Sequence, residues 1–288
     1  MDLFAMKICG NKRAITHTSV ASSFGIFDVE KGEFKKQKLS LLGINTDILP
    51  QVTGKSEIIG ECRSIPVSVP IGDNQASFLG SVNDNSDTLL INIGTGSQVS
   101  AVTEYKTVDG DIEIRPFIEG KYLICGSALC GGYAYSMLEQ FFRSYTVSAG
   151  MKEKSQYDTV NRLAAEAYER GNTGLLVDTS FLGKRSDPNA KGFIKNIDRN
   201  SFTPSDLVIG VLNGMCNELY GLYKAFGSLK TRIVASGGAV KRNEVLRSLL
   251  SDRFGMKVSI NTVEEEASMG AALFSALAAG KIIYNNEF

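Results

Sequence analysis

The sequence lacks the net charge typical of proteins that bind nucleic acid or membranes, and the cysteine spacing typical of disulfide or zinc frameworks. Its 31 Lys and Arg residues are balanced by 31 Asp and Glu residues, so no net charge attracts nucleic acid or an anionic membrane. Its five cysteines include no C-x-x-C pair, which favours buried thiols in a reducing compartment over a disulfide or zinc framework. These absences favour a small-molecule partner.

Long apolar runs are also missing. The longest stretch of small apolar residues, 267–280, is shorter than the ~20 residues that cross a bilayer and predicts a buried helix. The first residues show no charged head followed by an apolar export core. We therefore expect a cytoplasmic protein with no membrane partner. Its oligomeric state is open, with a homodimer as one option.

Two common nucleotide-binding motifs are absent. The chain contains neither a G-x-G-x-x-G fingerprint nor a G-x-x-x-x-G-K-[ST] loop. A different glycine pattern stands out in residues 66–101, where a strand leaves through Gly94, Thr95 and Gly96 into a second strand. Glycines let the backbone approach a ligand, so the N–H groups and the Thr95 hydroxyl can point at phosphate oxygens. An ordinary hairpin tip is the alternative.

Asp73 begins a short expected helix, directly after Gly72. Its carboxylate is ionised at neutral pH and can accept the proton of a hydroxyl group that lies within hydrogen-bond reach. The alternative is a structural role as the N-cap of the helix. Taken alone, the local pattern favours the cap.

Further candidates for nucleotide contacts lie at corners of the chain. The segment of Ser236, Gly237, Gly238 and Ala239 follows a β-branched strand and opens a helix, with Asn243 one turn in. An adenine or ribose could lie against this backbone, or the segment could be a plain turn. The remaining candidates, each with a structural alternative, are Gly131 before a helix, and Gly183 and Arg185 in a long loop.

The order of apolar segments predicts a mixed sheet with helices on both faces. Strands are expected at 57–60, 65–69, 88–93, 98–103, 112–117, 122–125, 175–177, 232–235 and 257–260. Helices are expected at 132–145, 157–170, 203–226, 241–254 and 267–279, and 181–197 is expected to be an irregular loop. The polar run 82–87 marks the expected domain boundary. The only histidine, His17, is expected to be a surface or sugar-domain residue without a catalytic role.

Five pieces of sequence occur in an order that resembles the FGGY family of carbohydrate kinases. They are IGDNQAS, INIGTGS, FLGKRSDP, ASGGAVKRN and EEEASMGAALFSAL. The pieces GDNQAS and FLGKR are most similar to the sedoheptulokinase branch, and matching pieces extend from about Ser22 to Gly280. The family also carries an Asp-x-Gly-Thr phosphate hairpin, and nothing similar precedes Ser22 here. The resemblance therefore implies a chain without the N-terminal part of the first domain.

The resemblance implies an α/β fold of the actin-like ATPase class, built on ribonuclease-H-like domains. Residues 86–288 would be the C-terminal nucleotide-binding domain, and residues 1–85 a remnant of the sugar-binding N-terminal domain that carries the catalytic Asp. Asp73 matches the family's catalytic base, the segment from Gly94 to Gly96 its second phosphate loop, and the corner at Gly237 its adenosine site. ATP and Mg²⁺ are the implied cofactors.

Two functional hypotheses follow. The first is an ATP-dependent kinase that phosphorylates a hydroxyl of a ketose such as sedoheptulose, bound with ATP in one crevice between Asp73 and the glycine corners. The second is a catalytically silent nucleotide-binding fragment of such a kinase.

Overall fold

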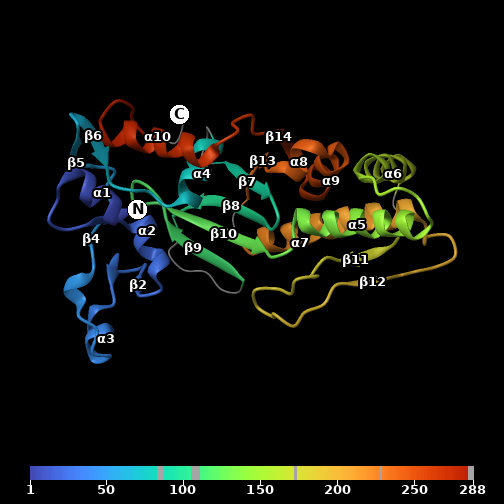
Figure 1. The fold of residues 1–288 in the computed structure, drawn as a ribbon, viewed down its shortest axis with the longest axis horizontal. Helices are drawn as coiled ribbons and strands as arrows, with labels where there is room; N and C mark the ends of the chain where they lie inside the picture. Colours follow the sequence, from blue (N-terminus) through green and yellow to red (C-terminus); the bar gives the residue numbers. More distant parts are fainter. Residues whose placement is uncertain (83–86, 105–110, 172–173, 228, 285–288) are drawn as a thin grey trace.

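The computed structural model describes residues 1–82, 87–104, 111–171, 174–227 and 229–284. Its centre is a six-stranded sheet (Figure 1) in the order β14-β13-β7-β8-β10-β9. These strands are β7 (Thr88–Ile93), β8 (Ser97–Thr103), β9 (Ile112–Pro116), β10 (Tyr122–Ala128), β13 (Arg232–Ser236) and β14 (Lys257–Ile260). The four consecutive strands β7 to β10 pair antiparallel, whereas β13 pairs parallel with β7 and β14. The predicted mixed sheet is confirmed.

Helices cover both faces of this sheet, as Figure 1 shows. On one side lie α4 (Asp73–Ser81) and α10 (Glu266–Ala278), and on the other α5 (Gly132–Ser148), α6 (Tyr157–Arg170), α7 (Pro204–Lys224) and α9 (Glu244–Phe254). Strand β7 serves both sides because successive side chains point to opposite faces. Leu89 and Ile91 join the α7 core, whereas Leu90 joins the core of α4 and α10.

Helix α7 is the clearest example of sequence deciding local structure. Thr203 caps its first turn in a reciprocal capping box with Asp206. The predicted apolar stripe is buried along its length. Gly210 and Gly214 face β11 (Leu176–Asp178), where a Cβ would lie 2.8 Å and 2.5 Å from atoms of Val177. The predicted helix is confirmed, and its glycines set its close packing on β11.

Helices α4 and α10 cross at backbone contact. A Cβ on Gly270 would lie 1.8 Å from the carbonyl oxygen of Ala76, and one on Gly80 would lie 2.0 Å from that of Glu266. Only residues without a side chain permit this approach. Although the expected boundary assigns α4 to the N-terminal part, α4 packs on the central sheet. The boundary itself falls largely at positions 83–86, outside the described residues.

The N-terminal segments form small sheets at the end of the molecule away from α6 (Figure 1). Strand β1 (Ile15–His17) pairs parallel with β4 (Gln51–Thr53), and the antiparallel pairs are β2 (Phe27–Asp28) with β3 (Glu33–Phe34) and β5 (Ile58–Cys62) with β6 (Ile65–Ser68). The helical segments are α1 (Asp2–Cys9), α2 (Thr18–Ala21), η1 (Ser22–Phe24), α3 (Lys36–Leu41) and η2 (Thr46–Ile48).

Three local expectations need correction. The loop expected at 181–197 contains β12 (Phe193–Lys195), which pairs with β11. The helix expected at 241–254 is split into α8 (Gly238–Arg242) and α9, because the side chain of Asn243 caps α9 by accepting from the backbone N–H of Leu246. For His17, the surface alternative is wrong because the residue is fully buried, whereas its place in β1 agrees with the alternative in the N-terminal part. In the described part of the chain, no helix combines the length and apolarity needed to span a bilayer.

Candidate functional site

Two cavities flank the turn of Gly94, Thr95 and Gly96. The Asp73 cavity, of about 510 Å³, is lined by Asp73, Asn74, Ser77, Ser81, Leu90, Asn92, Gly96, Ser97, Gln98, Ser100, Arg115, Ser127, Ala128, Leu129, Arg185 and Ser236. The Gly94 cavity, of about 580 Å³, is lined by Gly94, Thr95, Gly132, Tyr133, Tyr135, Ser136, Tyr157, Asp158, Asn161, Gly238, Ala239, Arg242 and Asn243. Most of the predicted site residues therefore line one of two adjacent cavities rather than one crevice, whereas Gly131, Gly183 and Gly237 line neither.

Three glycine corners pack against one another at this turn. The backbone N–H of Gly131 donates to the carbonyl of Thr95 at 3.0 Å, and that of Gly132 donates to Gly94 at 2.8 Å. A Cβ on Gly131 would lie 2.4 Å from the carbonyl of Gly96, and one on Gly237 would lie 2.4 Å from the carbonyl oxygen of Ile93. Gly131 and Gly237 thus serve packing, and Gly237 also has a φ of 95°.

Other members of these corners are open to the cavities. A Cβ on Gly94 would meet nothing closer than 3.8 Å, and one on Gly238 would meet only the end of the Arg242 side chain at 3.3 Å. Ala239 and Asn243 line the Gly94 cavity with them. Gly94 and Gly238 therefore present backbone to a cavity that Thr95 and Ala239 also line, and its volume suits a small ligand.

Asp73 lies at the first position of α4. The N-cap of that helix is Gly72, whose backbone is extended, so the capping alternative does not describe Asp73. Among the described residues, the Asp73 carboxylate has one hydrogen bond, accepted from the backbone N–H of Asn74 at 2.7 Å. The side chain is exposed and is the only acidic one lining its cavity. It is available to a ligand there.

The position of Asp73 is supported by a buried hydrogen-bond chain from the N-terminal segments. The backbone N–H of Gly72 donates to the Oγ of Ser19 at 3.0 Å. Ser19 Oγ lies 2.8 Å from His17 Nδ1, and the backbone N–H of Ser19 donates to the same nitrogen at 3.2 Å. Because Nδ1 accepts, the ring is neutral, and burial lowers the pKa of His17 to about 4. No pattern of residues around His17 had indicated this role.

Arg185 reaches the Asp73 cavity from the long loop, but it is held by an acid. It forms an ion pair with Glu113, which also pairs with Arg115 at 2.7 Å. Gly183 does not line either cavity. Gly183 has a φ of 82°, and a Cβ there would lie 2.6 Å from the carbonyl oxygen of Pro188. Its role is therefore to allow the tight turn of this loop.

The Gly94 cavity also contains residues that the sequence analysis missed. Asn161 on α6 accepts hydrogen bonds through Oδ1 from the hydroxyl of Tyr135 at 2.6 Å and from Nδ2 of Asn243 at 3.2 Å. Burial raises the pKa of Tyr135, which keeps its hydroxyl protonated as a donor. The helix at 157–170 was predicted, but nothing in its pattern indicated that its first turns face a glycine corner.

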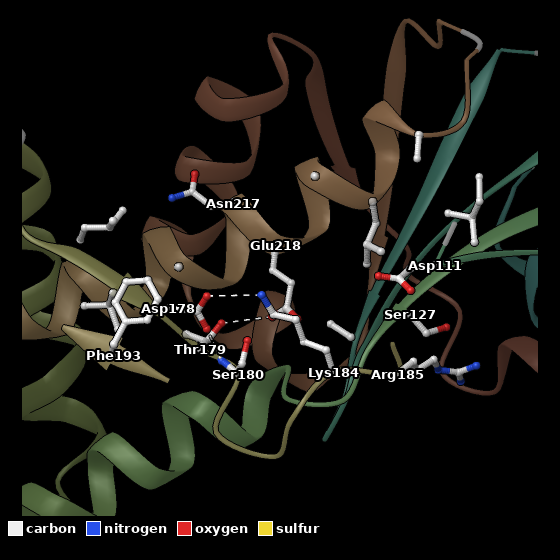
Figure 2. Close-up of a pocket in the computed structure, with 18 residues that line it drawn as sticks. Asp111, Ser127, Asp178, Thr179, Ser180, Lys184, Arg185, Phe193, Asn217 and Glu218 are labelled. Carbon is white, nitrogen blue, oxygen red and sulfur yellow. Dashed lines mark hydrogen bonds and ion pairs between the residues drawn. The ribbon is translucent and has the colours of Figure 1, made fainter. Parts of the chain in front are cut away.

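A third cavity, of about 500 Å³, lies between α7, β11 and the long loop (Figure 2). Two of its acidic side chains, those of Asp178 and Glu218, have partners within the lining. Lys184 Nζ lies 3.4 Å from Asp178 Oδ2, and Thr179 donates to Glu218 at 3.2 Å. Burial raises the pKa of Glu218. Arg185 is the only predicted site residue that lines it.

Comparison with solved structures defines the class of the fold. The chain matches a ligand-bound xylulose kinase from Lactobacillus acidophilus with a TM-score of 0.86 and 18% identity, over 99% of this chain and 59% of that one. It matches the glycerol kinase of Plasmodium falciparum with ADP with a TM-score of 0.80 and 17% identity, over 98% and 58%. The fold is that of the actin-like ATPases, as predicted.

The family models narrow this class. The N-terminal domain of the FGGY family of carbohydrate kinases matches residues 2–90, and the C-terminal domain of that family matches residues 89–279. The chain belongs to the FGGY family of carbohydrate kinases, which confirms the resemblance drawn from the motifs.

Curated relatives agree with this assignment. Glycerol kinase 2 of Sulfolobus acidocaldarius is 27% identical over 287 residues, which is 95% of this chain and 56% of that protein. The sedoheptulokinase of Mus musculus is 23% identical over 94% of this chain and 60% of that protein. The chain thus spans between one half and two thirds of the length of these relatives.

Proposed function

We propose that this protein phosphorylates a hydroxyl group of a sugar at the expense of ATP. The observation that carries the proposal is the shared wall between the two cavities. The turn of Gly94, Thr95 and Gly96 lines the Gly94 cavity through its first two residues and the Asp73 cavity through its third. A nucleotide whose phosphates lie on this turn would present its terminal phosphate toward the cavity of the acid. Residues 86–288 would bind the nucleotide, and residues 1–85 would contribute the base.

In this proposal, Asp73 is the general base. Phosphoryl transfer requires the acceptor hydroxyl in line with the terminal phosphate and a group that receives its proton. Asp73 holds an exposed carboxylate with a single backbone hydrogen bond, so an oxygen atom remains free to accept that proton. The backbone N–H groups of the turn and the Thr95 hydroxyl would hold the phosphate oxygens.

Mg²⁺ would enter with the nucleotide. Within the described ranges, no group of three or more His, Cys, Asp or Glu side chains could hold a metal ion by itself. A cation that is bound mainly by phosphate oxygens and water, with one or two carboxylates from protein, does not need such a group. When bound, Mg²⁺ would neutralise phosphate charge, and Asp73 is the carboxylate that lines the Asp73 cavity, toward which the terminal phosphate would point.

The acceptor in this proposal is a ketose such as sedoheptulose. The Asp73 cavity carries amide and hydroxyl groups that suit a polyhydroxylated ligand. Asn74 Nδ2 donates to Gln98 Oε1 at 3.2 Å, and Ser127 Oγ donates to the same oxygen at 3.4 Å. A sugar could exchange these weak contacts for its own. The use of ATP favours a cytoplasmic location.

The second candidate is a nucleotide-binding chain without turnover. The observation that motivates this candidate is that Asp73 lines a different cavity from the one lined by Gly94, Thr95 and Gly238. It predicts binding of ATP without any sugar-dependent formation of ADP.

One experiment separates the two candidates. We expect ATP-Mg²⁺ to bind in calorimetry, and ADP release to increase with one sugar from a panel of ketoses and polyols. Asp73→Asn should abolish that increase and leave ATP binding intact, whereas Asp47→Asn, the same change outside both cavities, should leave both unchanged. Binding without turnover for every sugar would favour the second candidate. Turnover that survives Asp73→Asn would remove Asp73 from the role of base.

A further inference from the structure

The first turns of α6 contribute two polar side chains to the Gly94 cavity, and one of them has a fixed orientation. The backbone N–H of Leu246 donates to Asn243 Oδ1 at 2.9 Å, so the other end of that amide must be its NH₂ group. This NH₂ group donates to Asn161 at 3.2 Å. The atom of Asn161 that receives it is therefore its oxygen.

The orientation of Asn161 leaves a donor for a ligand. The Tyr135 hydroxyl donates to the same Asn161 oxygen at 2.6 Å, so both lone pairs of that oxygen are used. Among the described residues, the Nδ2 group of Asn161 makes no hydrogen bond. It belongs to a residue that lines the Gly94 cavity.

Asp158 lies three residues earlier on the same helix. Side chains three positions apart share one face of a helix, and both residues line the Gly94 cavity. Asp158 is exposed, is the only acidic residue in that lining, and has no hydrogen bond or ion pair within the described part of the chain. Its carboxylate can only accept hydrogen bonds. The face of α6 thus offers one donor and one acceptor.

The donor of Asn161 and the acceptor of Asp158 complement the hydrogen-bonding edge of adenine but not that of guanine. Adenine presents an acceptor, N7 or N1, beside the N6 amino donor, whereas guanine presents an oxygen acceptor at the place of that donor. The tyrosines Tyr133, Tyr135 and Tyr157 line the same cavity and provide aromatic surface for a base. With the phosphates at Gly94 and Thr95, the base would lie toward this aromatic part of the lining.

We propose that Asp158 and Asn161 form a base-reading pair that makes the nucleotide site selective for adenine over guanine. The proposal rests on the proposed function, which places a nucleotide in the Gly94 cavity. Asn161 donates to a ring nitrogen, and Asp158 accepts from the exocyclic amino group. Guanine would place its O6 against the carboxylate, with two acceptors facing each other.

Calorimetry on the full chain with ATP, GTP, ITP and inorganic tripolyphosphate tests this pair. We expect the wild-type protein to bind ATP about 5- to 150-fold more tightly than GTP, the range for a bidentate contact to a base. ITP, which shares O6 but lacks the 2-amino group, should bind as GTP does. Tripolyphosphate should bind equally to the wild-type protein and to every variant.

Two variants each change the hydrogen-bonding character of one member of the pair. Asp158→Asn replaces the acceptor with an amide that can donate to O6, and should lower the ratio of ATP to GTP affinity by about tenfold or more. Asn161→Asp keeps an oxygen for Tyr135 and Asn243 but removes the donor, and should weaken ATP binding by a similar factor. Asn189→Asp, the same change on an exposed residue outside the cavity, is the control.

The outcomes are distinct. A lower ratio of ATP to GTP affinity in Asp158→Asn and weaker ATP binding in Asn161→Asp, each with an unchanged melting temperature, support the pair. A wild-type protein that binds ATP, with neither of these changes in the variants, overturns the pair and leaves the proposed function intact. A wild-type protein that binds none of the three nucleotides overturns the proposed function and the pair with it.

Discussion

The backbone N–H of Gly72 donates to the Oγ of Ser19 at 3.0 Å across a sequence separation of 53 residues. Gly72 is the N-cap of α4, and Asp73 follows it directly. A side chain from α2 therefore fixes the start of the helix that carries the proposed base. Both Ser19 and its partner His17 are buried, so this bond is formed away from water and is costly to break.

Replacement of Ser19 by alanine should loosen the start of α4. We expect Ser19→Ala to lower the free energy of unfolding by ~1–3 kcal/mol, because the Gly72 N–H group and His17 Nδ1 lose a buried partner. Sugar-dependent turnover should fall through kcat, with ATP affinity unchanged, and urea unfolding and steady-state kinetics measure the two effects. Ser23→Ala, on an exposed neighbour, should change neither. An unaltered kcat in Ser19→Ala would show that the bond does not position Asp73.

The glycine corners predict a contrast between two alanine substitutions. Gly237→Ala places a methyl group 2.4 Å from the carbonyl oxygen of Ile93 at a φ of 95°, and overpacking of this kind costs ~1–3 kcal/mol. Gly221→Ala lies in α7, where a Cβ meets nothing within 4 Å, and alanine favours helix over glycine by ~1 kcal/mol. Thermal unfolding should show a lower midpoint for the first variant and an equal or higher one for the second. Equal midpoints for the two variants would contradict the packing of Gly237 on Ile93.

The buried His17 predicts a dependence of stability on pH. Burial lowers its folded-state pKa from 6.5 to about 4, so between these values the unfolded chain binds a proton that the folded chain does not. Stability from this group is complete above about pH 6.5 and falls as the pH drops toward 4, by up to ~3 kcal/mol. The negative charge of Glu57 favours the protonated ring and so opposes the lowering of the His17 pKa. The rings of His17 and Phe274 pack edge to face, with their centroids 5.4 Å apart. Urea unfolding at stepped pH should show this slope in the wild-type protein and a smaller slope in His17→Gln. The same slope in both would assign it to carboxylates instead.

Loss of the ion pairs of Glu113 should loosen one loop and leave the overall stability of the protein nearly unchanged. Arg185 and Glu113 are both well exposed, at 44% and 40% of their side-chain surfaces, so the pair should contribute less than ~1 kcal/mol. It nevertheless ties the loop that carries Arg185 to β9. Glu113→Gln should leave the midpoint of unfolding nearly unchanged and speed trypsin cleavage after Lys184 and Arg185. Glu30→Gln, on an exposed residue, is the control, and equal cleavage rates would contradict the tie.

The sequence by itself determined the family, most of the elements and the local corners. The period of apolar residues in 203–226 specifies a buried helix face, and Gly72, Gly94 and Gly237 mark corners because their positions follow strands or precede helices. These features are local, so a pattern of neighbouring residues is enough to predict them.

Only the tertiary structure decided which of these corners meet and what surrounds them. Gly131 packs on the Gly96 carbonyl, Ser19 beside the buried His17 accepts from Gly72, and Asn161 joins the glycine corners from a helix whose own sequence points to no ligand. Each relationship joins residues far apart in the chain through backbone contact or a single hydrogen bond. Such contacts leave no periodic signal in sequence, because they depend on how the sheet and its helices bring distant segments together.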